Sequence, residues 1–293
     1  MIISVSRRTD IPAFYSTWFM NRIKAGFVMT RNPFNYHQTR QISLRPEDVD
    51  VIVFWTRNSA PLQSDLKLLD DMGYHYYFQY TITGYPRTLE TATLHPLKAI
   101  DHFIQLSQQI GREKVIWRYD PVLLCDLLPV GEHIRLFSKI AGLLAGYTER
   151  VVISFADFYK KTERNLLRIS ELNSRDIMQN EADYLRVSEA FMMIAAANGM
   201  EIRTCSEKAV IPEQDIPHGA CIDAALIEKL FHLNLSLKKD KNQRAECLCA
   251  HSVDIGAYNT CVHGCQYCYA TYNHQQAVRN YKQHDPASPF LQS

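Results

Sequence analysis

The sequence predicts an α/β protein: a TIM-type (β/α) barrel, complete or partial, with a C-terminal cysteine-rich, cluster-binding extension. Three observations lead to this fold class. Short apolar runs alternate with helix-period stretches along the first two thirds of the chain, as in βαβ units. The length of 293 residues suits a single α/β barrel. Seven of the eight cysteines follow residue 200. We therefore assign residues 1–210 to the barrel and residues 211–293 to an extension that packs over its mouth.

Six segments are typical of strands buried on both faces, because each is short, apolar and rich in Val, Ile or aromatic residues. In chain order they are Ile2–Ser6, Val51–Thr56, His75–Thr83, Lys114–Tyr119, Val151–Ala156 and Glu201–Cys205. Strands that alternate with helices imply right-handed crossovers and a parallel sheet. The segment between Gly26 and Pro46 is too long for a simple crossover, so we expect an extra hairpin around residues 31–34.

Six helices are expected between and after these strands, because apolar residues recur at helical spacing and glycine follows most of the stretches. In chain order they are Pro12–Ala25, Ser64–Met72, Pro96–Ile110, Glu132–Leu144, Glu181–Asn198 and Cys221–His232. Asp10 is the expected N-cap of the first helix, and Gly26 is its expected stop.

Charge balance, the length of the apolar runs and the number of cysteines limit the classes of protein to which this chain can belong. Lys and Arg number 32 against 31 Asp and Glu, a formal net charge of +1, so the whole-chain charge does not favour a protein that coats nucleic acid. No run approaches the roughly 18 apolar residues that cross a bilayer, and no signal-peptide pattern opens the chain. We therefore expect a cytoplasmic protein without a membrane partner. In that compartment eight cysteines indicate metal or redox chemistry before disulfides.

Charged residues follow the predicted strands, where barrel enzymes keep their active sites. Arg7, Arg8 and Asp10 follow the first strand, and Arg118 and Asp120 end the fourth. Guanidinium groups match carboxylates and phosphates, so we predict catalytic roles for Arg7, Asp10, Arg118 and Asp120. The alternative is structural: Asp10 caps a helix and the arginines pair with carboxylates of neighbouring strand ends.

The strongest motif is Cys261-Val-His-Gly-Cys265-Gln-Tyr-Cys268. Three thiolates within eight residues suit one soft metal centre, either an iron–sulfur cluster or zinc. Three ligands would leave one iron of a cubane open to another ligand. A zinc knuckle completed by His251 or His263, or a purely structural cluster, remains the alternative.

This loop, with Tyr267 as its aromatic residue, resembles the hallmark of the radical S-adenosylmethionine superfamily, C-x3-C-x-aromatic-C. The chain is also similar to an uncharacterised bacterial family with a C-terminal cluster of this type, from Ser4–Asp10 to Asp254–Thr260. The superfamily usually carries the loop near its N-terminus, so the position here departs from the pattern.

The resemblance implies a [4Fe–4S] cluster on the three loop cysteines and S-adenosylmethionine on its open iron. It also implies a (β/α) barrel and an electron donor such as flavodoxin or ferredoxin. Reductive cleavage of S-adenosylmethionine would yield a radical that abstracts hydrogen from an unidentified substrate. A small molecule or a peptide is favoured as that substrate, and a nucleic-acid lesion stays open.

The usual Gly-Gly-Glu run for the S-adenosylmethionine amine is not evident in the sequence. We predict that Thr81 and Thr83 serve by backbone contacts, that Glu207 accepts a hydrogen bond from an amine, and that Tyr267 packs over the cluster.

The four remaining cysteines that bear on chemistry are Cys205, Cys221, Cys247 and Cys249. Together they would complete a second, closed site, either [4Fe–4S] or structural zinc, with iron–sulfur favoured. The alternative is that Cys205 and Cys221 are ordinary buried cysteines. Cys125 has no partner by spacing and is assigned to the core.

Two other functional classes remain beside the radical enzyme. One is an iron–sulfur protein for electron transfer or sensing without S-adenosylmethionine. The other is a zinc-stabilised binding protein.

Overall fold

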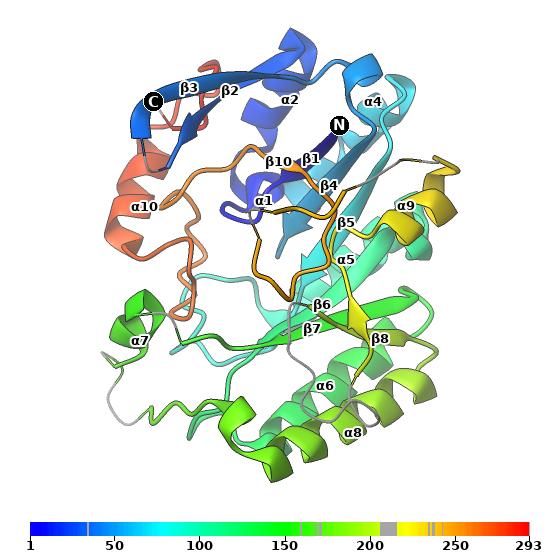
Figure 1. Ribbon diagram of the computed structural model, residues 1–293, viewed down its shortest axis with the longest axis vertical. Helices are drawn as coiled ribbons and strands as arrows, with labels where there is room; N and C mark the ends of the chain where they lie inside the picture. Colours follow the sequence, from blue (N-terminus) through cyan, green and yellow to red (C-terminus); the bar gives the residue numbers. More distant parts are fainter. Residues whose placement is uncertain are drawn as a thin grey trace.

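One open sheet of eight parallel strands organises the molecule (Figure 1). The computed structural model describes residues 1–292 except 34, 159, 168, 170–171, 206–215, 234, 236–237 and 242. The strand order is β10-β1-β4-β5-β6-β7-β8-β9. The bounds are β1 Ile2–Val5, β4 Val51–Thr56, β5 Tyr76–Thr81, β6 Val115–Val122, β7 Arg150–Phe155, β8 Glu201–Cys205, β9 His218–Gly219 and β10 Val253–Asp254.

The α/β class is confirmed, but the predicted TIM-type barrel, complete or partial, is wrong. Closing a barrel requires the first and last strands of the sheet to pair. Here the edge strands β9 and β10 are two residues long, and each pairs with one neighbour, β8 or β1. Within the described residues no further strand bridges these two edges. Alternating strands and helices are common to closed barrels and open sheets, so the pattern in the sequence did not separate them.

The two faces of the sheet pack against two separate hydrophobic cores. Side chains alternate along a parallel strand: Ile52 and Phe54 of β4 enter the larger core, whereas Val51 and Val53 enter a smaller one. The smaller core also contains Ile227 of α9 (Ala224–Phe231). The helix that contains Ile227 therefore packs on one face of the sheet, whereas helical residues such as Phe19, Phe103, Phe137 and Phe191 pack on the opposite face.

All six predicted strands occur, and two of them, β4 and β8, match residue for residue. The helix expected over Pro96–Ile110 occurs at those bounds, and most of the others occur with shifted ends. The stretch expected over Pro12–Ala25 is divided at Tyr15, whose φ of −134° leaves the helical region. The helices are α1 Ile11–Phe14, α2 Ser16–Ala25, α3 Ala60–Gln63, α4 Leu66–Asp71, α5 Pro96–Ile110, α6 Val130–Leu144, α7 Lys160–Leu166, α8 Glu181–Ala197, α9 Ala224–Phe231 and α10 His274–Lys282.

The expected hairpin is the antiparallel pair β2 (Phe27–Asn32) and β3 (Asn35–Ser43). It lies on the same side of the molecule as α10 (Figure 1). None of the helices in the described residues is both long and apolar enough to cross a bilayer.

The return of the chain to β1 depends on Asp254 in β10. Its carboxylate accepts hydrogen bonds from the Ser4 and Ser6 hydroxyls at 2.9 and 2.7 Å and from the Arg7 backbone N–H at 2.8 Å. These bonds hold the segment that precedes the cysteine loop against the carboxyl end of the first strand.

Candidate functional site

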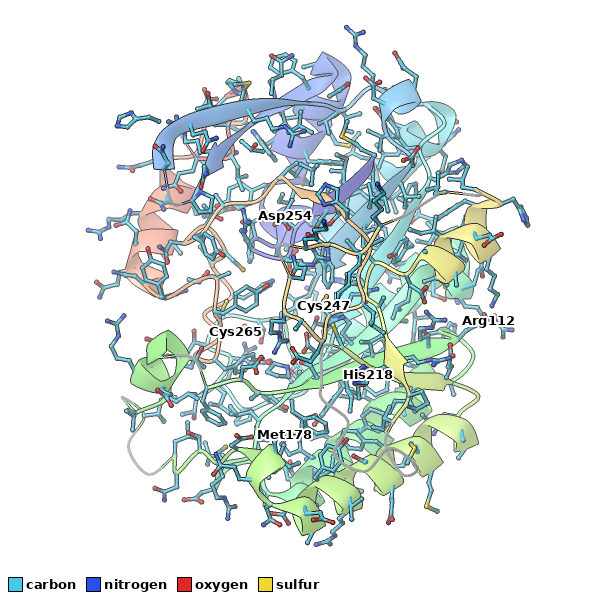
Figure 2. All side chains as sticks on the ribbon, viewed as in Figure 1. Arg112, Met178, His218, Cys247, Asp254 and Cys265 are labelled. Atoms are coloured by element: carbon cyan, nitrogen blue, oxygen red, sulfur yellow. The ribbon has the colours of Figure 1, made fainter. Side chains whose placement is uncertain are left out.

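A cavity of about 440 Å³ opens where the carboxyl ends of the central strands meet. Residues that follow or end β1, β4, β5, β6, β7 and β8 all line it. In Figure 2 Cys247, Asp254 and Cys265 lie in the middle of the molecule, whereas Arg112 lies at its edge. Seven cysteines line the cavity: Cys205, Cys221, Cys247, Cys249, Cys261, Cys265 and Cys268. The structure therefore brings both predicted cysteine sets to one space.

The cysteine loop 261–268 is held by backbone bonds to the segment after β5. The Ala92 N–H donates to the His263 carbonyl at 2.9 Å, and the Gln266 N–H donates to the Leu89 carbonyl at 2.9 Å. Gly264 has a φ of +70°, and a Cβ there would stand 2.0 Å from Thr91 Oγ1. Only glycine meets both demands, because other residues rarely adopt this φ and no side chain fits.

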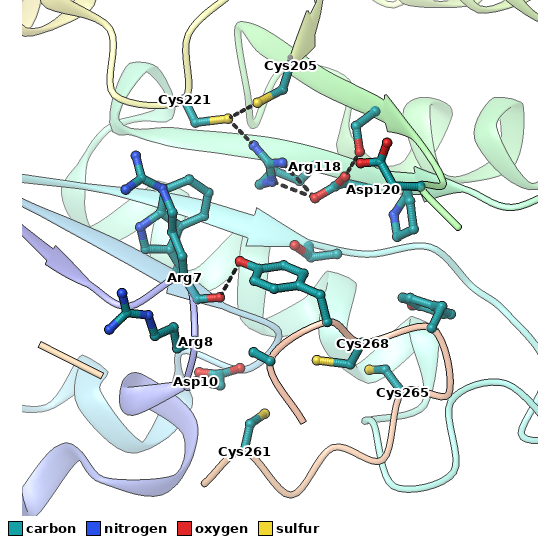
Figure 3. A pocket seen from close by; sticks show the side chains of 18 of the residues that line it. Arg7, Arg8, Asp10, Arg118, Asp120, Cys205, Cys221, Cys261, Cys265 and Cys268 are labelled. Atoms are coloured by element: carbon teal, nitrogen blue, oxygen red, sulfur yellow. Dashed lines mark hydrogen bonds and ion pairs between the residues drawn. The ribbon is translucent and has the colours of Figure 1, made fainter. Parts of the chain in front are cut away.

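The three loop cysteines are half-buried and face the cavity, with Cys265 and Cys268 side by side in Figure 3. Burial raises the pKa of Cys261, and the neighbouring Cys268 and Cys265 add to this. Burial also raises the pKa of Cys265 to about 12, although Arg57 opposes it. Buried thiols that repel one another's ionised forms are suited to a positively charged partner, since a coordinating metal deprotonates a thiol outright.

The described residues form no site for a single metal ion around the cysteine loop. Among the described residues no three Cys, His, Asp or Glu side chains are arranged around one point where a metal ion would sit. His263 donates from Nε2 to Asp10 at 2.7 Å. His251 is exposed, and its Nδ1 lies 3.7 Å from Asp240. The predicted zinc knuckle, with either histidine as fourth ligand, therefore gains no support from this arrangement.

Asp10 is a positioning residue in this geometry. Its Oδ1 accepts from the Ala13 N–H at 3.0 Å, which caps α1, and from the Thr56 hydroxyl at 2.7 Å. Its Oδ2 accepts from the Arg57 N–H and from His263, both at 2.7 Å. The carboxylate thus ties α1, the end of β4 and the cysteine loop together, although it also lines the cavity.

Arg57 and Glu90 form a buried ion pair beside the loop, with Arg57 Nη1 2.9 Å from Glu90 Oε1. Arg57 Nη2 also donates to the Tyr267 hydroxyl at 2.7 Å, and Tyr267 contacts Glu90. Burial raises the pKa of Tyr267 well above its usual value, and Glu90 adds to this despite Arg57. Tyr267 is therefore an anchored neutral phenol that lines the cavity next to Cys265 and Cys268.

The other residues predicted to contact S-adenosylmethionine are Thr81, Thr83 and Glu207, and they do not share one location. Thr81, the last residue of β5, lines the cavity. The Thr83 hydroxyl instead donates to Glu90 at 2.5 Å. Glu207 lies outside the described residues. No motif in the sequence indicated Glu90, because it lies between the strands and helices and two of its partners, Arg57 and Tyr267, are 33 and 177 positions away.

Arg7 and Arg8 leave β1 and line the cavity. The Arg7 guanidinium lies 5.2 Å from the Trp55 ring centroid, and its Nη1 donates to Ser252 at 3.3 Å. Its Nη2 is buried without a hydrogen-bond partner. Arg8 lies 5.1 Å from the Tyr258 ring centroid. Of the strand-end carboxylates, Asp254 at the end of β10 interacts electrostatically with Arg7.

Arg118 and Asp120 form the second predicted pair. Arg118 Nη2 lies 2.6 Å from Asp120 Oδ2, and Arg118 Nη1 donates to Cys221 Sγ at 2.7 Å. Burial would raise the pKa of Asp120, but Arg118 and Ser154 outweigh it and lower that pKa. Both side chains line the cavity with opposite fixed charges.

A family profile described as a domain of unknown function, DUF1848, matches residues 2–270. The match covers every strand of the parallel sheet and all the cysteines that line the cavity. No curated protein and no solved structure matches the chain. The chain therefore belongs to the DUF1848 family.

Proposed function

We propose that this protein is a radical S-adenosylmethionine enzyme that acts on a small molecule or a peptide. Cys261, Cys265 and Cys268 would hold a [4Fe–4S] cluster. The observation that carries the proposal is that these three thiols of one loop open into a cavity where the parallel strands end. Bound there, the cluster and S-adenosylmethionine would supply one-electron cleavage of the sulfonium bond and a radical able to abstract hydrogen.

Residues around the cavity would hold the cysteine loop in position and place positive charge beside it. Asp10 and the Arg57–Glu90 pair hold the loop from two sides. Arg7 and Arg8 place two cations on the cavity wall, and guanidinium groups match a carboxylate or phosphate. Thr81 offers a strand end beside them.

Several wider expectations belong to the same proposal. Residues 1–210 act as the scaffold, and residues 211–293 act as the extension that carries the cluster loop. The protein works in the cytoplasm, where thiols stay reduced, and takes electrons from a flavodoxin or ferredoxin. A nucleic-acid lesion is the less favoured substrate, because the net charge is only +1.

The test is anaerobic reconstitution with iron and sulfide, followed by electron paramagnetic resonance. The reduced protein should give a [4Fe–4S] signal that changes when S-adenosylmethionine is added, and 5′-deoxyadenosine should accumulate. The Cys268→Ser variant should lose both, whereas Cys125→Ala, which alters a core cysteine away from the cavity, should keep both. A cluster without any 5′-deoxyadenosine would refute the enzyme and favour an electron-transfer or sensing protein. A colourless protein that holds zinc at the loop would favour a binding protein.

A further inference from the structure

Four cysteines from three separate segments meet on the other side of the cavity. Cys205 ends β8, Cys221 lies ahead of α9, and Cys247 and Cys249 precede β10. All four are free, and all but the half-buried Cys205 are buried. If these four cysteines were ordinary core residues, nothing would bring them to the same place in the fold. Their proximity therefore needs a separate explanation.

The four sulfur atoms are in mutual contact around Cys249. Cys221 Sγ donates to Cys205 Sγ at 2.9 Å (Figure 3). The thiols of Cys205, Cys221 and Cys247 each form a hydrogen bond with Cys249 Sγ. The four sulfur atoms thus form one cluster around Cys249, and only Cys205 among them is partly exposed.

Two arginines supply positive charge to this group. Arg118 donates to Cys221 Sγ at 2.7 Å. Arg7 interacts electrostatically with Cys249, with the Asp254 carboxylate and with Cys221, and its buried Nη2 has no hydrogen-bond partner. Asp120 balances part of the charge of Arg118. A buried, unsatisfied guanidinium is costly unless an anion faces it. A metal held by four thiolates is such an anion, because its net charge is negative for zinc and for a [4Fe–4S] cluster alike.

We propose that Cys205, Cys221, Cys247 and Cys249 form a second metal centre closed by four thiolates, with Arg7 and Arg118 as its charge partners. The centre takes a thiophilic metal group, a [4Fe–4S] cluster or zinc. Binding Zn²⁺ would form four metal–sulfur bonds and release the thiol protons to solvent, without oxidation or reduction of the protein.

The present sulfur positions explain why no described group of three is arranged around one ion. A zinc–sulfur bond of about 2.3 Å places tetrahedral ligands roughly 3.8 Å apart, and Cys221 and Cys205 are at 2.9 Å. Rotation about the side-chain bonds would separate the sulfur atoms. A centre with four protein ligands has no free position for S-adenosylmethionine, so its role differs from that of the loop cysteines. It would join the segments before α9 and β10 to the end of β8.

The experiment uses the full chain, purified without oxygen, with all three loop cysteines changed to serine. Iron, sulfide and zinc are measured per chain. We expect this triple variant to keep either about four irons with about four sulfides or about one zinc. Adding Cys221→Ser and Cys249→Ser should remove that metal, whereas adding Cys125→Ala should not. Iron with sulfide identifies a cluster, and zinc without iron identifies a structural ion.

A folded triple variant that holds neither metal would overturn the inference. A Cys205–Cys221 disulfide, found by mass mapping of the protein digested without reductant, would also overturn it. If the variant that lacks Cys221 and Cys249 does not fold, X-ray absorption of the metal in the triple variant decides. Sulfur-only coordination supports the centre, and nitrogen or oxygen ligands contradict it. Absence of 5′-deoxyadenosine from the wild-type protein would refute the proposed enzyme but leave this metal centre standing.

Discussion

The Asp10 carboxylate accepts a 2.7 Å hydrogen bond from His263 across 253 positions of sequence, and both side chains are buried. This contact joins the residues that follow the first strand to the middle of the cysteine loop. The same oxygen of Asp10, Oδ2, also accepts a hydrogen bond from the Arg57 backbone N–H. The position of the loop therefore depends on a carboxylate that the sequence marked as catalytic.

Replacing Asp10 with Asn should lower the free energy of unfolding by about 1–3 kcal/mol, because the amide nitrogen cannot accept from the buried donors it would face. Cluster retention should fall with it. Urea denaturation and iron content per chain measure both effects. Asp101→Asn on the exposed face of α5 is the control. Equal stability of the two variants would argue against a positioning role for Asp10.

The Gly264→Ala variant should destabilise the protein by more than Gly146→Ala does. Both glycines have positive φ, +70° and +83°, but only the added Cβ at Gly264 would meet a side chain. We expect an extra cost of about 1–3 kcal/mol from overpacking and a loss of bound iron. Thermal unfolding and iron analysis give the comparison. Adding Thr91→Ala, which removes the clashing Oγ1, should restore part of the loss, and no recovery would count against the steric explanation.

Changing Glu90 to Gln should cost about 3–5 kcal/mol, because it leaves the buried Arg57 without its charge partner. The two side chains are 4% and 12% exposed, so solvent screens the pair little. A double-mutant cycle with Arg57→Met, measured by urea unfolding, tests this. The double variant should be more stable than the sum of the single effects predicts. Simple additivity would show that the pair is uncoupled.

Stability should fall as pH drops below about 6.5, in part because of His133. Burial lowers the pKa of His133 from 6.5 to about 4. The unfolded chain therefore binds a proton that the folded chain excludes between these two pH values, and unfolding becomes easier as pH falls. The expected loss from this group is about 1 kcal/mol between pH 6.5 and 5.5.

The measurement is the free energy of unfolding across that pH range for the wild type and for His133→Gln. The variant should show a shallower slope, even if its stability at neutral pH is lower. It loses a side chain that contacts Tyr119 and the Leu123 carbonyl, both at 3.0 Å. Parallel slopes for the two proteins would assign the acid sensitivity to other groups.

Local patterns in the sequence predicted the strands well. Val51–Thr56 is a strand at its predicted bounds, because β-branched and aromatic residues without polar interruption suit a doubly covered sheet. The spacing of the loop cysteines predicted that the three side chains lie together, and all three line the cavity. By contrast, the break at Tyr15 inside a predicted helix depends on its backbone φ, which helical spacing of apolar residues does not reveal.

Sequence alone determined the α/β class and the order of the main strands and helices, and it singled out the cysteines as candidate metal ligands. Those properties arise from neighbours within a few positions, through side-chain period and ligand spacing. Tertiary structure alone decided that the sheet stays open, that β10 returns beside β1, and that Arg7 and Arg118 stand next to the four distant cysteines. These depend on contacts between segments up to some 250 positions apart, whose free energies become available only once the chain has folded.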